Sequence, residues 1–249
     1  MTAPERAPLG AALALLLALV SLTGPLSPAL MAVAVGVVAL LVGIGWPGLL
    51  ELPSATGTRI VVAATGLLGA LVTVLAPERF TPVSGVVMVC ATGVFASFVH
   101  QMLRPERRGL TESLTGTVAG VFVSGIGACW VIAQNESADL GTGTVVTAIA
   151  AGLAATLLLG ATPLRALARF SASVLVGAAV TAALAATLAG MAPLVAVLVG
   201  LVTAVGASAA QLLVDSSLVA RDPLPSLAVA AVPVATVGVL AHLAVMLGL

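Results

Sequence analysis

The most polar stretch of the chain, between positions 100 and 113, could bind an anion. Its ionisable and hydroxyl side chains include those of Arg104, Arg107, Arg108, Glu112 and Ser113. Guanidinium groups bind phosphate and carboxylate oxygens, and free N–H groups at the start of a helix can add to such a site. The stretch therefore predicts a phosphate-binding mouth. The alternative is a basic cluster that sets membrane orientation and touches anionic headgroups.

A second polar cluster follows a long apolar run and contains Gln211, Asp215, Ser217 and Arg221. Gln211 and Asp215 are four positions apart, so they share one face of a helix. Because charges at the edge of a membrane turn toward the bundle and pair there, we expect this cluster to join the first in one anion or lipid-phosphate site. The alternative is a helix end that simply reaches water.

Other chemistry is poorly represented. Cys90 and Cys129 lie in apolar runs without metal-ligand spacing, and no paired acids could hold a metal. We therefore expect no catalytic constellation, no metal and no cofactor. The net charge of zero gives no reason to expect a nucleic-acid partner. His242 has no acid within 223–249, so we expect a lone histidine bonded to a neighbouring helix.

The elements that must position these residues are membrane helices. The chain is 61% hydrophobic and 7% charged, far below the roughly 25% charge of soluble domains. A crossing needs about 20 apolar residues. Turn and breaker residues, Asn135-Glu136 among them, predict nine such runs in one domain spanning 1–249. The runs are 8–23, 27–47, 58–76, 81–103, 112–134, 142–162, 169–190, 192–214 and 224–248. This predicts an all-α, polytopic membrane bundle.

Arginine placement predicts the orientation. With the N-terminus in the cytoplasm, the inner segments hold every arginine except Arg79, as the positive-inside rule requires. The first run could imitate a signal peptide, but Glu5 cancels Arg6 ahead of it, so we expect a retained helix. The exclusive use of Arg over Lys indicates a GC-rich, actinobacterial-type genome.

Two features concern helix packing. Gly116, Gly120 and Ser124 form a ladder of small residues that should let a neighbouring backbone approach closely. Trp46 and Trp130 lie near the ends of predicted runs, where indole side chains prefer the membrane interface.

Residues 212–221, Leu-Leu-Val-Asp-Ser-Ser-Leu-Val-Ala-Arg, resemble the motif Gly-Asp-Leu-x-Glu-Ser-x-x-Lys-Arg of the phosphatidate cytidylyltransferase family. Ser217 and Arg221 match it, and Val214 replaces Leu. That family makes CDP-diacylglycerol from CTP and phosphatidate. The acids of its motif are absent here, and nothing acidic follows Asp222. The resemblance therefore implies a non-catalytic relative.

These observations favour a multi-pass protein of the bacterial cytoplasmic membrane that binds lipid or a partner. The expected partners are membrane lipids and other membrane proteins. The alternatives are a permease for a small or lipidic solute, using groups such as Ser124, Thr147 or Thr181, and a lipid-modifying enzyme. A lipid binder should show a lateral groove closed on its outer side, a permease a wettable path, and an enzyme clustered acids.

Overall fold

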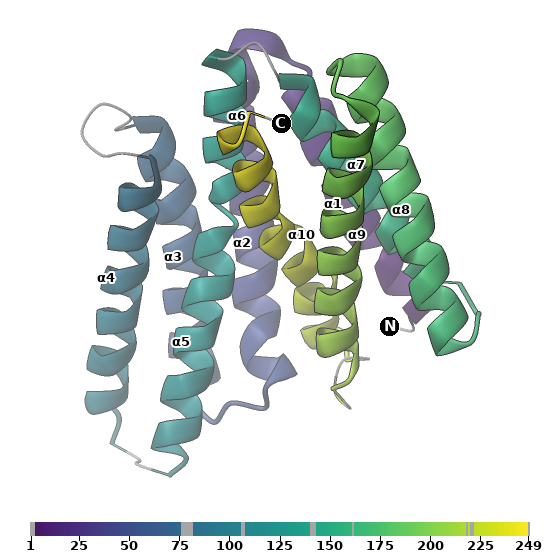
Figure 1. Ribbon diagram of the computed structural model, residues 1–249. Coiled ribbons are helices and arrows are strands. Elements are labelled where there is room, and N and C mark those ends of the chain that lie inside the picture. Colours follow the sequence, from purple (N-terminus) through teal and green to yellow (C-terminus); the bar gives the residue numbers. More distant parts are fainter. Residues whose placement is uncertain are drawn as a thin grey trace.

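A computed structural model of the chain describes residues 3–75, 82–105, 108–139, 143–160, 162–217, 219 and 222–248. All regular structure within these ranges is helical (Figure 1). The helices are α1 (Ala3–Ser21), α2 (Ser27–Leu49), α3 (Ala55–Leu75), α4 (Pro82–Met102), α5 (Leu110–Ile126), α6 (Cys129–Asp139), α7 (Gly143–Gly160), α8 (Ala166–Leu188), α9 (Pro193–Asp215) and α10 (Pro225–Met246), with a short 3-10 turn, η1 (Gly24–Leu26), between α1 and α2.

Seven helical stretches in the described ranges are long and apolar enough to cross a membrane. They are α2, α3, α4, the stretch Leu110–Ala138 that combines α5 with α6, α8, α9 and α10. Helices satisfy their own backbone polar groups, which is why apolar segments adopt them in lipid. The prediction of a helical, multi-pass membrane bundle is confirmed. Two shorter apolar helices, Pro8–Ser21 and Thr144–Gly160, accompany the seven.

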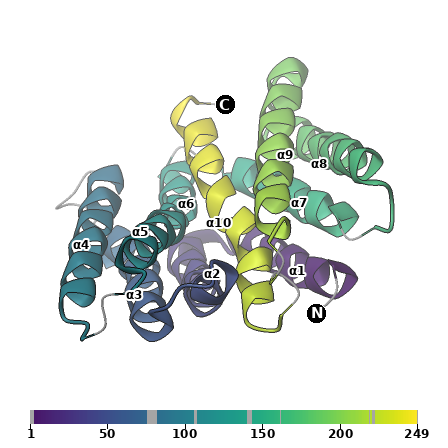
Figure 2. The same ribbon diagram turned by 90° about the horizontal axis from the view of Figure 1, so that it is seen from below.

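The bundle has two flanks and a centre. Seen from below, α3, α4 and α5 form one flank and α7, α8 and α9 the other (Figure 2). Between them lies α10, which packs against α2, α9, α6 and α1. Its most apolar window is 72% buried, against 28% for α8, so α10 is the central helix.

One membrane passage is broken. Only Gly127 and Ala128 separate α5 from α6, and their N–H groups bond three residues back, to Ser124 O and Gly125 O. The predicted run 112–134 covers this break without revealing it, because the residues next to the break are mostly apolar on both sides. The helical stretch also continues to Asp139, so the interpretation of Asn135-Glu136 as a breaker was wrong.

The ladder of small residues on α5 packs as predicted. A Cβ at Gly120 would lie 2.6 Å from ring atoms of Trp46, and one at Gly116 would lie 2.6 Å from Leu52. Ser124 Oγ lies against Gly66 of α3. The ladder thus lets α2 and α3 approach α5 closely.

Both tryptophans, which lie near the ends of predicted runs, are buried between helices. Trp46 is 7% exposed and donates from Nε1 to Gly116 O at 2.8 Å. Trp130 is 1% exposed and donates to Val234 O at 2.8 Å. Each indole finds an acceptor on a neighbouring helix, so burial leaves no unpaired N–H.

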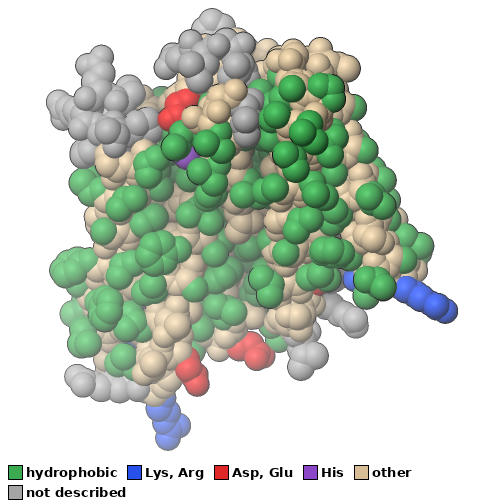
Figure 3. Space-filling model, viewed as in Figure 1, with side chains coloured by type: hydrophobic (Ala, Val, Ile, Leu, Met, Phe, Trp, Pro, Cys, Tyr) green, Lys and Arg blue, Asp and Glu red, His purple; other side chains and the backbone are tan. Residues whose placement is uncertain are grey.

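Charged side chains gather at the ends of the bundle, and hydrophobic ones cover its sides (Figure 3). The described arginines all belong to one end, at the starts of α1, α3 and α8 and in the link between α4 and α5 (Figure 1). We call this the basic end. The arginines whose side chains the structure describes there are Arg59, Arg104, Arg108, Arg165 and Arg169.

Candidate functional site

The first predicted cluster forms a hydrogen-bonded network at the basic end of α4 and α5. Gln101, 1% exposed, donates from Nε2 to Ser113 Oγ at 2.8 Å. Arg104 Nη1 donates to Gln101 Oε1 at 2.9 Å. Arg108 and Glu112 are exposed to solvent. Arg104 and Ser113 are thus joined through one buried amide that ties α4 to α5.

Further hydrogen bonds connect this network to α3. Ser54 Oγ and His100 Nε2 are hydrogen-bonded at 2.6 Å. Thr58 Oγ1 and Thr117 Oγ1 are hydrogen-bonded at 2.7 Å. Paired polar groups of this kind hold helices together in lipid. The geometry favours a structural role for this cluster. Arg107 lies outside the described residues.

The second predicted cluster lies on the opposite flank. Gln211 and Asp215 line a small polar pocket between the basic ends of α7, α8 and α9, and Ser217 Oγ donates to Leu49 O at 3.2 Å. Arg221 lies outside the described residues. Because α9 packs mainly against α8, α10 and α7, the structure places this cluster away from α4 and α5. The two clusters, expected to share one site, are on different sides of the bundle (Figure 2).

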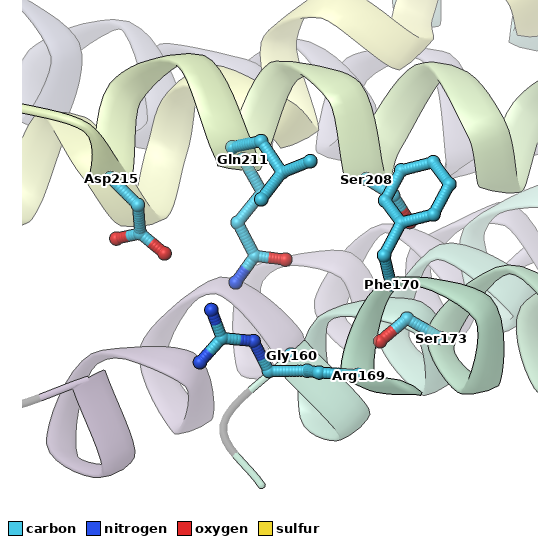
Figure 4. Close-up of a pocket in the computed structure, with 8 residues that line it drawn as sticks. Gly160, Arg169, Phe170, Ser173, Ser208, Gln211 and Asp215 are labelled. Atoms are coloured by element: carbon cyan, nitrogen blue, oxygen red, sulfur yellow. The ribbon is translucent and has the colours of Figure 1, made fainter. Parts of the chain in front are cut away.

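An arginine of α8 lines the same pocket as Gln211 and Asp215. Arg169 points its guanidinium toward the amide of Gln211 (Figure 4). Sequence reasoning missed Arg169 as a site residue because it counted only as an orientation signal. Spacing could have found it, since Arg169 and Ser173 are four apart on α8, as Gln211 and Asp215 are on α9.

Two hydroxyl groups that line this pocket are buried. Ser173 is 2% exposed and Ser208 is 4% exposed, and both line the pocket. Neither Oγ makes a hydrogen bond within the described part of the chain. A buried polar group left unpaired costs about 1–3 kcal/mol. The pocket therefore combines the apolar side chains of Phe170 and Leu212 with polar groups, two of which have no partner among the described residues.

A larger, apolar groove runs between α9 and α10 toward the other end of the bundle. It encloses about 230 Å³. Its floor is formed by buried Val199, Thr203 and Ala244, and its rim by Leu198, Val202, Leu240, Leu243 and Leu247. Thr203 Oγ1 already donates to Val199 O at 2.9 Å, so the groove presents hydrocarbon throughout.

The end opposite the basic end holds an acid–base pair. His242 Nδ1 of α10 lies 3.0 Å from Glu136 Oε2 of α6. The expected contact of His242 with a neighbouring helix is confirmed, but the expectation of a lone histidine was wrong, because the partner is an acid. The sequence of 223–249 contains no acid, and the partner of His242 lies instead on another helix, α6.

The described residues contain no group of three or more His, Cys, Asp or Glu that could hold a metal ion. Comparison with protein-family models, curated proteins and solved structures finds no match. The resemblance of residues 212–221 to the cytidylyltransferase motif stays a prediction.

Proposed function

We propose that the chain is a multi-pass protein of the bacterial cytoplasmic membrane that binds a membrane lipid, holding an acyl chain in the groove between α9 and α10. The lipid-exposed sides and the seven long apolar helices support a membrane location. In the proposed topology α1 and α7 also cross, and α5 with α6 counts as one crossing. The N-terminus and the basic end face the cytoplasm, in accord with the positive-inside rule.

The observation that carries the proposal is the lateral groove. Its rim is exposed, with Leu198 at 52% and Leu247 at 65%, while its floor is buried. Such a shape opens sideways, toward the hydrocarbon of a membrane. The groove offers no free hydrogen-bonding group to a polar ligand, because the hydroxyl of Thr203 donates to a carbonyl of its own helix.

The size of the groove suits part of an acyl chain. Its volume of about 230 Å³ is more than ten times the roughly 20 Å³ of the polar pocket, so it has room for several methylene groups in a row. Because bulk lipid is as apolar as the groove, binding depends on close packing rather than on the hydrophobic effect. We therefore expect one lipid to be held longer than its neighbours, without strong headgroup selection at this groove.

Filling the groove tests the proposal. Val202→Trp would place an indole in the space of the chain, whereas Leu201→Trp adds the same bulk at the next position, which lies outside the groove. The measurement is the number of phospholipids retained per protein after detergent purification, by native mass spectrometry. We expect Val202→Trp to lose one retained lipid and Leu201→Trp to keep it. Equal retention in both variants and the unaltered protein would contradict the proposal.

A further inference from the structure

We propose that the polar pocket between the basic ends of α7, α8 and α9 binds an oxyanion, a phosphate group that belongs either to a lipid headgroup or to free phosphate. Its donors are Arg169, Gln211 and the hydroxyls of Ser173 and Ser208 (Figure 4). The inference is independent of the acyl-chain groove, since the groove uses residues 198–203 of α9 and this pocket uses residues 208–215.

The two serines differ from other buried hydroxyls in these helices. Thr156, Thr181 and Thr203 each donate to a carbonyl four residues earlier, which is how hydroxyls on helices are usually satisfied. Ser173 and Ser208 make no such bond and lie on facing helices around the same space. Their hydroxyls are therefore available to donate to a ligand.

The residues at the mouth of the pocket and those deeper in it contact different parts of the proposed ligand. Arg169 and Asp215 lie nearer the helix ends than Ser173 and Ser208, so they flank the mouth while the serines lie deeper. The enclosed volume of about 20 Å³ admits one water-sized atom. One oxygen of a phosphate group fits between the serines, and its other oxygens stay at the mouth beside the guanidinium.

Gly160 and Asp215 affect how the mouth of the pocket binds an anion. Gly160 ends α7 against Gln211, and a Cβ there would lie 2.9 Å from Gln211 Cδ, so only glycine leaves the amide this position. The carboxylate of Asp215 also lines the pocket and opposes an anion. We therefore expect a moderate affinity for phosphate, which should rise when the charge of Asp215 is removed.

The experiment uses the full chain, delipidated in a neutral detergent, with thermal stability followed on addition of inorganic phosphate at constant ionic strength. A parallel arm places the protein in nanodiscs of phosphatidylcholine with or without phosphatidylglycerol. We expect stabilisation by phosphate, by phosphatidylglycerol or by both, and the arm that responds identifies the source. Arg169→Gln should weaken the response roughly tenfold or more, since a charge-assisted hydrogen bond is lost. Asp215→Asn should strengthen it.

Two variants serve as controls. Arg165→Gln removes an exposed arginine one turn earlier, and Ser171→Ala removes a hydroxyl that already bonds Leu167 O. Both should respond as the unaltered protein does, while Ser173→Ala with Ser208→Ala should not. The proposal is overturned if neither ligand stabilises the chain, or if Arg169→Gln and Arg165→Gln respond alike. A double serine variant that is more stable and equally responsive would also overturn it.

Discussion

At the scale of single residues, the pair of His242 and Glu136 joins two helices far apart in the sequence. Their side chains are 8% and 30% exposed, and neither paired atom has another hydrogen-bond partner among the described residues. The pair therefore fastens the broken passage to the central helix.

A double-mutant cycle on this pair should show coupling. His242→Gln and Glu136→Gln should each lower the free energy of unfolding, and their effects should be non-additive by on the order of 1 kcal/mol. The coupling free energy should be small because Glu136 is partly exposed to solvent. Unfolding in mixed micelles gives the measurement. His242→Gln combined with Asn135→Ala, a neighbour on α6, should be additive; additivity of the Glu136 pair as well would show that no interaction exists.

At the scale of elements, α7 and α8 interlock through two glycine–threonine pairs. Gly152 lies against Thr181 Oγ1, and Gly177 lies against Thr156 Oγ1, so each helix supplies one gap and one hydroxyl. Close approach of this kind allows helices to associate in lipid without a hydrophobic driving force. It also fixes the spacing of the helices that frame the polar pocket.

Adding one methyl group to this interlock should destabilise the bundle. Gly177→Ala would overlap Thr156 Oγ1, and overpacking costs typically about 1–3 kcal/mol. Gly36→Ala is the matched control, because its Cβ would meet only the end of the flexible Leu67 side chain, at 3.2 Å. Thermal unfolding should separate the two, and Thr156→Ala should partly rescue Gly177→Ala. Identical melting of both alanine variants would exclude the interlock.

Sequence reasoning located the helices well and their interruptions poorly. The predicted run 192–214 falls within about a residue of α9 at each end, because Pro193 and the polar residues after Asp215 mark its limits. The break at Gly127 and Ala128 left no trace in hydropathy. The site was found in part: Gln211 and Asp215 line the pocket together, as expected, but the arginine that lines it with them is Arg169. Which flank a helix joins depends on packing among similar apolar faces, and composition does not encode it.

At the scale of the whole molecule, the chain is polarised. The described arginines share one end, and successive long helices alternate in direction, so α1 begins at the basic end and α10 ends at the opposite one (Figure 1). The same asymmetry was readable from the sequence, because loops near helix ends carry the orientation signal regardless of how the helices pack.

This polarity predicts the location of the C-terminus. A reporter active only in the cytoplasm should be inactive when fused after Leu249, and an export-dependent reporter should be active there. Fusions after Ser54 should give the reverse result and serve as the control. An active cytoplasmic reporter after Leu249 would require an even number of crossings or an inverted chain.

The buried tryptophans give the molecule a built-in optical label. The chain has two Trp and no Tyr, so its near-ultraviolet emission comes from two indoles. Trp46 lies near the basic end, bonded to α5, and Trp130 lies beside the break, bonded to α10. With Trp46→Phe, the remaining light reports on the broken passage; with Trp130→Phe, it reports on the junction of α2 and α5. With these two substitutions, made one at a time, the emission wavelength of the remaining tryptophan reports separately on two regions of the bundle.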